Sequence, residues 1–372
     1  MLYGMKKLKC ALCGGEMKRN GFTKAGKQRW RCKVCDASTT YRYDAQNSEF
    51  EAFLNWLFGK TTQKNQRIED RSFRRKIAPY WNYWPLPPIH EQPETAIHVD
   101  GIYLARNVVI LIASSQDGVI GWYLARGESS HAWIALLRRI REPELVVTDG
   151  GTGFEKAKKA LWPQVKVQRC LYHVFCQIKR LTTTRPKLPA GQELYRLVLD
   201  LLNIHTLAEA KIWTLRYLDW GKRWNSFLCE KTYNERGHWA YTHKHLHRAR
   251  SGLNKLLAQN VLFTYLENSG YPSTNNRIEG GINARLREVL YNHRGMPLIH
   301  RIKAVFWWCY THCPQTVKTG DVLLTMPTDK QIVAIYRQMA TNEKTFGEIS
   351  NWGDAVVWSE LHRSAGFFNA WD

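Results

Sequence analysis

Short apolar runs between residues 95 and 167 predict a series of strands. The run at 95–99 ends at Asp100, and the runs at 108–114 and 118–125 are separated by a Ser-Gln-Asp-Gly turn, which indicates a three-stranded meander. Helices and strands then alternate, with a helix at 131–140, a buried strand that ends at Asp149, a helix at 154–161 and a strand near 165–167. This order predicts a mixed α/β sheet covered by helices.

Residues 179–271 differ, because their apolar positions recur at helical spacing. We expect an all-α insertion here. Most of its tryptophans are expected in a packed core, and stacking on an unpaired base is the alternative. Its histidines are expected on a solvated or phosphate-facing loop, and a second metal site is the alternative. The residues concerned are Trp213, Trp220, Trp224, Trp239, His238, His243, His245 and His247.

Composition adds a strong positive charge to this picture. The 372 residues include 54 Lys and Arg against 32 Asp and Glu, a net charge of +22, and 44% are hydrophobic. This apolar content suffices for two or more folded domains and excludes a mainly disordered chain. The charge favours a polyanionic partner, because each phosphate that is neutralised releases a counterion. A solvated basic face is the alternative.

The sequence gives no reason to expect a membrane partner. No apolar run approaches the roughly 20 residues of a membrane span, and the first residues lack the apolar region of a signal peptide. We therefore expect a cytoplasmic protein.

Two Cys-x2-Cys pairs near the amino terminus predict one structural zinc ion. The pairs Cys10 with Cys13 and Cys32 with Cys35 are 18 residues apart, which allows four thiolates to surround the metal tetrahedrally. The residues between them indicate two short strands around a turn, as in a zinc ribbon. Basic side chains on this module are expected to contact DNA; a metal that only stabilises a small module is the alternative. They are Lys18, Arg19, Lys24, Lys27, Arg29 and Arg31.

A helical pair follows the cysteines. Apolar residues at 50–57 have helical spacing, and the next helical segment carries Arg71, Arg74 and Arg75. Two helices of which the second is basic suggest a helix-turn-helix reader of DNA, although an ordinary amphipathic pair gives a similar pattern. The sequence Gly-Lys-Thr at 59–61 lacks the glycine five positions before it that a phosphate loop requires, so we expect no nucleotide cofactor.

Asp100 and Asp149 each follow an apolar strand, and the two strands are expected to lie side by side. Two close carboxylates repel each other, and Mg²⁺ or Mn²⁺ relieves that repulsion. Two such ions stabilise the attacking and leaving oxygens of a phosphodiester displacement. Strand-terminal aspartates are also common in turns, so a purely structural role is the alternative.

A third acid, Glu279, stands at the start of a predicted helix after the possible capping residues 273–275. Its carboxylate is expected to point toward the same sheet edge, although an acid in a first turn also complements the helix dipole. Three neighbouring arginines are expected to hold phosphates: Arg277, Arg285 and Arg287.

The sequences HVDG, VVTDGGTGF, RCLYH and STNNRIEGGINARLREVLYNHRGM, in this order behind two cysteine pairs, resemble the bacterial insertion-sequence transposases related to eukaryotic Mutator elements. The resemblance covers roughly residues 1–313. It implies a ribonuclease-H-like core in which Asp100, Asp149 and Glu279 form a DDE triad with two Mg²⁺ or Mn²⁺ ions. Cys170 and His173 match the family's Cys-x2-His pair. Structural support is the expected role of that pair, because two residues alone cannot complete a zinc site.

These observations predict the following segments: a zinc ribbon at 1–43, a helix-turn-helix-like module at 44–90, a ribonuclease-H-like core at 95–178 and 272–313, the all-α insertion at 179–271, and a helical tail at 314–372. We expect a nucleoid-associated transposase that binds double-stranded DNA at the element ends and at the target, and cleaves and joins strands. Because two ends must be held together, a homodimer is expected. A non-catalytic zinc-ribbon DNA-binding regulator and a structure-specific nuclease are the alternatives.

Overall fold

The computed structural model describes residues 9–10, 15–40, 43–59, 70–316, 323 and 326–334. The chain forms two compact units. One contains residues 1–83 and 317–328, and the other contains residues 84–316 and 329–372. Within the described residues, no helix is long and apolar enough to cross a membrane.

The first unit begins with a small antiparallel sheet in the order β1-β2-β3. Its strands are β1 (Met17–Phe22), β2 (Gln28–Cys32) and β3 (Ser38–Thr40). Gly26 closes the turn between β1 and β2 with a φ of 72°, a conformation that favours glycine. The two expected strands are therefore present, and β3 is an addition that the sequence pattern did not indicate.

The same unit contains helices α1 (Tyr43–Phe58) and α2 (Asp70–Ile77), followed by the 3₁₀ helix η2 (Ala78–Asn82). Aromatic rings hold them together: Trp56 packs edge-on against Phe73, and Phe53 against Trp81. Both expected helices are present. The link at 60–69 lies outside the described residues, so the helix-turn-helix remains a prediction.

The second unit is built on a five-stranded mixed sheet in the order β6-β5-β4-β7-β8. The strands are β4 (Ala96–Ala105), β5 (Val108–Ser114), β6 (Val119–Ala125), β7 (Leu145–Thr148) and β8 (Lys166–Arg169). β4, β5 and β6 form the expected antiparallel meander, and β4, β7 and β8 are parallel. The prediction of a mixed sheet is confirmed.

The expected end of the first strand at Asp100 is wrong. β4 continues to Ala105, because its antiparallel hydrogen bonds to β5 extend beyond the point where parallel pairing with β7 ends at His98. Asp100 therefore lies inside a strand, whereas Asp149 directly follows one.

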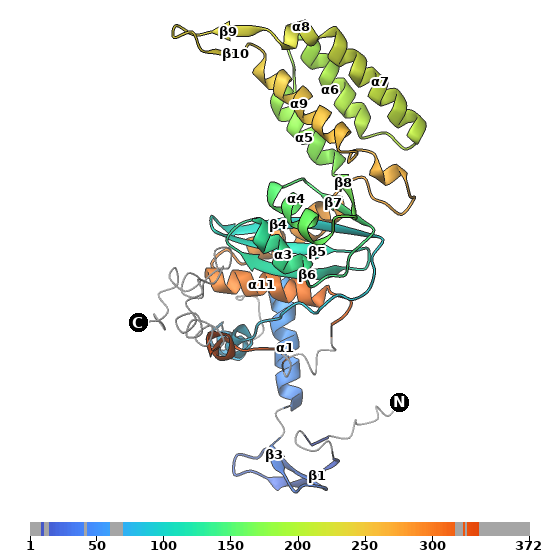
Figure 1. The fold of residues 1–372 in the computed structure, drawn as a ribbon. Helices are drawn as coiled ribbons and strands as arrows, with labels where there is room; N and C mark the ends of the chain where they lie inside the picture. Colours follow the sequence, from blue (N-terminus) through green and yellow to red (C-terminus); the bar gives the residue numbers. More distant parts are fainter. Residues whose placement is uncertain are drawn as a thin grey trace, which may run out of the picture. The chain divides into compact units, whose positions relative to one another are not determined.

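Helices cover both faces of this sheet (Figure 1). Helices α3 (Ser130–Leu137) and α4 (Thr152–Leu161) bury Trp133 and Phe154 against the face that carries Val109 and Leu111. The opposite face carries Trp122, which packs against Phe306 of α11 (Leu298–Thr311). Because both faces are covered, the strands are almost continuously apolar rather than alternating.

Residues 171–266 form a helical bundle with its own core. Its elements are α5 (Leu171–Thr182), α6 (Pro189–Leu201), α7 (Leu207–Arg223), α8 (Asn225–Leu228), α9 (Lys244–Ala258) and η3 (Thr264–Leu266). Trp213 and Trp220 are buried, and their indole N–H groups donate to backbone oxygens of α6 and its first turn. The bundle core begins at Leu171, before the expected boundary at 179.

The expectation of an all-α segment missed a β-hairpin. Strands β9 (Lys231–Tyr233) and β10 (Trp239–Tyr241) pair antiparallel, and Gly237 has a φ of 75° in the turn. Trp239 is half exposed, and the Lys231 Nζ lies over its ring at 4.1 Å from the ring centre. Two histidines beside the hairpin stack on aromatic rings: His243 on Phe227 and His247 on Tyr241. His243 also lies 3.1 Å from the Glu230 carboxylate.

The segment with Glu279 is also different from the expected α-helix. Residues Arg277–Asn283 (η4) form a π-helix, and α10 (Ala284–Asn292) continues from it. The apolar stripe is nevertheless present, since Ile278, Ile282 and Leu286 are buried. Helix η4 starts after Asn276 and has no side-chain cap, so the expected capping by residues 273–275 is wrong.

Candidate active site

The pairing of β4 with β7 brings Asp100 and Asp149 to the same level of the sheet. Ala96 is paired with Leu145, and the register continues in parallel to His98 and Val147. Paired residues in this register differ by 49 positions in the sequence, and the same difference places Asp149 opposite Asp100. Neighbouring strands are about 4.8 Å apart, so side chains at equal register lie next to each other on one face.

Backbone amides orient both carboxylates. Asp100 Oδ1 accepts a hydrogen bond from the N–H of Gly101 at 2.8 Å, and Asp149 Oδ1 accepts one from the N–H of Gly151 at 3.2 Å. Burial raises the pKa of Asp100 to about 6, and the charge of Asp149 contributes in the same direction. The two carboxylates are thus close enough to repel each other.

Glu279 joins these two acids from helix η4. Burial, followed by the charges of Asp100 and Asp149, raises its pKa to about 7. The structure therefore brings together three acids that are 49 and 130 positions apart along the chain. Carboxylate oxygens are the donors that Mg²⁺ and Mn²⁺ prefer, so the site's chemistry fits divalent cations.

The π-helical turn carries a second group to the same place. Asn283, one turn after Glu279, is fully buried and donates from Nδ2 to Asp100 Oδ2 at 2.7 Å. Gly280 permits the close packing of this turn, because a Cβ atom there would lie 2.4 Å from Asn276 Oδ1. π-Helical turns occur frequently at functional sites. Here the turn supplies one acid and fixes the orientation of another.

Asn275 anchors this helix to the sheet and to the helical bundle. Its side chain is fully buried, donates to the carbonyl oxygen of Val99, and lies 3.0 Å from His98 Nδ1. Its backbone N–H donates to Cys170 Sγ at 3.1 Å. Asn275, which was expected to cap the helix, therefore connects the loop at 273–276 to β4 and to the start of α5.

A fourth acid, Glu128, was missed by sequence reasoning. It precedes α3, and burial, followed by the charges of Asp149 and Asp100, raises its pKa to about 7. Its side chain lies over Gly101, where a Cβ atom would be 2.8 Å from Glu128 Oε1. The Tyr103 hydroxyl donates a hydrogen bond to it. No sequence signal distinguishes this acid from an ordinary one in a polar turn.

Cys170 and His173 lie beside Glu279, at the start of α5. Cys170 is 1% exposed, and His173 Nδ1 is 3.1 Å from Glu279 Oε1. Burial raises the pKa of the Cys170 thiol and lowers that of the His173 imidazole. The pair thus touches the acid helix itself, in addition to supporting the loop before it.

The three expected phosphate-binding arginines have different surroundings. Arg277 donates to the backbone oxygens of Ser115 and Gln116, and this ties η4 to the turn between β5 and β6. Arg285 is exposed and pairs with Glu288. Arg287 is close enough to Asp100 and Glu279 for its charge to lower the pKa of both. Of these three arginines, Arg287 is the one whose charge acts on Asp100 and Glu279 within the described residues.

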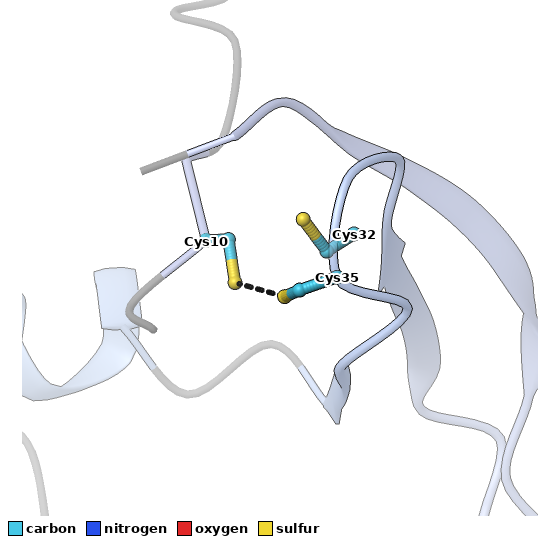
Figure 2. A group of neighbouring side chains, drawn as sticks. All are labelled: Cys10, Cys32 and Cys35. Atoms are coloured by element: carbon cyan, nitrogen blue, oxygen red, sulfur yellow. Dashed lines mark hydrogen bonds between the residues drawn. The ribbon is translucent and has the colours of Figure 1, made fainter. Parts of the chain in front are cut away.

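The amino-terminal cysteines form a separate cluster. Figure 2 shows Cys10, Cys32 and Cys35 gathered from two segments, with the sulfurs of Cys10 and Cys35 3.6 Å apart. The three sulfurs lie within 4.8 Å of one another, which fits a zinc site with thiolate ligands. Cys13, the expected fourth ligand, lies outside the described residues.

The basic residues expected to contact DNA are all exposed in the first unit. Their exposed guanidinium and ammonium groups are accessible to a polyanion; Arg31 also pairs with Asp36 at 3.0 Å, and Arg19 lies over the ring of Trp30. They are Lys18, Arg19, Lys24, Lys27, Arg29 and Arg31 on the small sheet, and Arg71, Arg74 and Arg75 on α2.

Two comparisons with known proteins found similar sequences. Residues 94–224 match the family model described as "Transposase, Mutator family". Over 64 residues, the chain is 38% identical to the transposase for insertion sequence element IS905 of Lactococcus lactis. This alignment covers 16% of the chain and 16% of that relative, so the chain spans only a small part of the curated relative that it matches. Residues 94–224 are therefore similar to the transposases of the Mutator family, and a shorter stretch is similar to an insertion-sequence transposase.

Proposed function

We propose that this chain is a DDE transposase that cleaves and joins DNA strands with Asp100, Asp149 and Glu279. The observation that carries the proposal is geometric: the parallel register of β4 and β7 places Asp100 beside Asp149, and Glu279 of η4 lies close enough for both charges to raise its pKa. An arrangement of partly buried like charges costs free energy unless cations neutralise it. A purely structural role does not account for that cost.

The sheet order supports a ribonuclease-H-like core. An antiparallel meander is followed by two parallel strands added beside β4, with helices on both faces. In such a sheet the two aspartates belong to adjacent strands, and the third acid comes from a helix late in the chain. The helical bundle lies between the second and third acids in sequence, as an insertion does.

The residues have separate roles in the proposed reaction. Asp100, Asp149 and Glu279 would hold two Mg²⁺ or Mn²⁺ ions, which supply charge stabilisation at the attacking and leaving oxygens of a phosphodiester. The amides of Gly101 and Gly151 fix one oxygen of each aspartate, and Asn283 fixes the second oxygen of Asp100. Such fixed carboxylates need little reorganisation when DNA binds. Arg287 offsets part of their charge.

DNA recognition is assigned to the first unit. The segment 1–90 carries 18 Lys and Arg against 7 Asp and Glu, and the exposed cations of the small sheet and of α2 suit the phosphate backbone. One zinc ion held by Cys10, Cys13, Cys32 and Cys35 would keep the small sheet folded. We propose element ends and target DNA as partners, and a homodimer, because two ends must be joined in one assembly.

A cleavage and joining assay on DNA that carries the element's terminal repeats tests this proposal. The wild type is expected to cut and join in Mg²⁺, and Asp149→Asn is expected to do neither while it still binds the DNA. Glu155→Gln, which changes an exposed acid in the next helix, is the matched control and should remain active.

The other outcomes distinguish the remaining functions. Binding without cleavage by the wild type would favour a regulatory DNA-binding protein. Cleavage without joined products would favour a structure-specific nuclease. Equal cleavage by wild type and Asp149→Asn would remove the acids from the reaction.

A further inference from the structure

Three potential metal ligands of different chemistry meet where helix α5 begins beside η4. Cys170 precedes α5 and His173 is in its first turn, so the two side chains project from the same side of the helix. Glu279 faces them from η4. One sulfur, one imidazole nitrogen and one carboxylate oxygen lie within 4.8 Å of one another.

The contacts at this cluster leave ligand atoms unsatisfied. His173 Nδ1 and Glu279 Oε1 are both shielded from solvent and lie 3.1 Å apart, which is an ion-pair distance if the imidazole is protonated. Burial disfavours that protonation, and neither atom makes a hydrogen bond within the described part of the chain. Buried polar atoms without partners are rare in folded proteins and cost free energy. Two such atoms facing each other next to a buried thiol indicate that a further group belongs between them.

The donor set selects the kind of group. Sulfur and imidazole ligands favour a borderline or soft ion such as zinc over Mg²⁺, which prefers oxygen alone. Three protein ligands with one remaining position are typical of zinc sites that stay open. The Asn275 N–H that donates to Cys170 Sγ is the type of outer contact that orients a thiolate ligand.

We propose that Cys170, His173 and Glu279 bind a second zinc ion, distinct from the one in the cysteine cluster of the first unit. Zinc binding releases the proton of the Cys170 thiol to solvent, so the site's affinity falls as pH falls. The ion supplies the missing partner for both His173 Nδ1 and Glu279 Oε1.

This site deepens the proposed function, on which its catalytic consequence rests. A carboxylate has two oxygens, so Glu279 can bind zinc through Oε1 and keep Oε2 for the ions held with Asp100 and Asp149. Zinc would then act as a positioning element: it would fix the carboxylate that comes from the most distant part of the chain. Cys170 and His173 are positioning residues in this account, because they act through Glu279.

Zinc content of the purified full-length chain tests the site. The wild type is expected to hold about two zinc ions per chain, and His173→Ala, Cys170→Ser and Cys32→Ser about one each. Cys176→Ser is the matched control, because this cysteine lies on the same helix outside the cluster, and it should retain the wild-type zinc content. Cobalt substitution gives a second measurement, since loss of His173 should remove part of the cobalt–thiolate absorption.

The outcomes separate this inference from the proposed function. Asp100→Asn should lose cleavage but keep the wild-type zinc content. Loss of the zinc site, by contrast, lowers the zinc content, so the two failures are distinguishable. Equal zinc in wild type and in a folded His173→Ala, checked by circular dichroism, overturns the proposal. If His173→Ala fails to fold, His173→Gln answers the same question, and wild-type zinc in that variant likewise overturns it.

Discussion

Replacement of Asp100 by asparagine should stabilise the metal-free protein, although it removes a proposed catalytic residue. Burial together with the charge of Asp149 raises the pKa of Asp100 from 3.8 to about 6. The folded chain therefore retains this proton over a pH range in which the unfolded chain has already lost it. The free energy of unfolding consequently falls as pH rises from about 4 to about 6, and the whole penalty is present at pH 7.

The size of the effect follows from the shift. Two pKa units correspond to about 3 kcal/mol of destabilisation at neutral pH. Asparagine removes this penalty, but it has one oxygen for two donors, the Gly101 N–H and the Asn283 amide, so one hydrogen bond worth about 1 kcal/mol is lost. The net stabilisation is about 2 kcal/mol, or roughly 4–8 °C in the melting temperature of a unit of this size.

Scanning calorimetry in EDTA and in Mg²⁺ measures both parts of this prediction. Without metal, Asp100→Asn should melt above the wild type at pH 7, and the difference should shrink toward pH 4. In Mg²⁺ at a hundred times its dissociation constant, the wild type should gain about 2.7 kcal/mol and the variant far less. Glu235→Gln, at an exposed position of the β9–β10 turn, should change neither melting temperature.

Two results would refute this reasoning. One is a metal-free Asp100→Asn that melts below the wild type at pH 7, because the buried charge would then carry no penalty. The other is an equal response of wild type and variant to Mg²⁺, because the aspartate would then have no part in cation binding.

Three further substitutions test other parts of the structure. Glu128→Gln should weaken Mn²⁺ binding about tenfold in calorimetric titration, because it removes one of four clustered acids, and unchanged affinity would exclude Glu128 from the site. Asn275→Ala should lower the free energy of unfolding by about 2–4 kcal/mol in urea, because it leaves the Val99 oxygen and His98 Nδ1 without their partner; a loss below about 0.5 kcal/mol would contradict the bridging role. Cys32→Ser should reduce affinity for duplex DNA in a fluorescence anisotropy titration without changing the Mg²⁺-sensitive melting transition, and equal affinity would remove the cysteine cluster from DNA binding.

The sheet and the position of two acids could be predicted from the sequence because local pattern determines them. Apolar runs indicated the meander and the strand before Asp149, and adjacency of β4 and β7 followed from ordinary α/β connectivity. The length of β4 was not predictable in this way. Its continuation beyond Asp100 depends on pairing with β5, and polar residues such as Asp100 within the strand conceal that continuation.

The remaining parts of the site depend on contacts between distant residues. Glu128 resembles any acid in a turn until the fold brings it over Gly101. The π-helical turn at Glu279 has the apolar spacing of an α-helix, and only the packing of Asn276 against Gly280 and of Asn283 against Asp100 distinguishes it. The β9–β10 hairpin is short and exposed, so its few residues did not alter the helical pattern around it.

In the proposed enzyme, Asp100, Asp149 and Glu279 bind divalent cations together. Anomalous diffraction from crystals of the full chain grown with Mn²⁺ and DNA tests it most directly. Manganese peaks are expected within coordination distance of both aspartates, one of them also within reach of Glu279. Manganese peaks away from these carboxylates, or a Glu279 side chain turned from the aspartates with DNA bound, would contradict it.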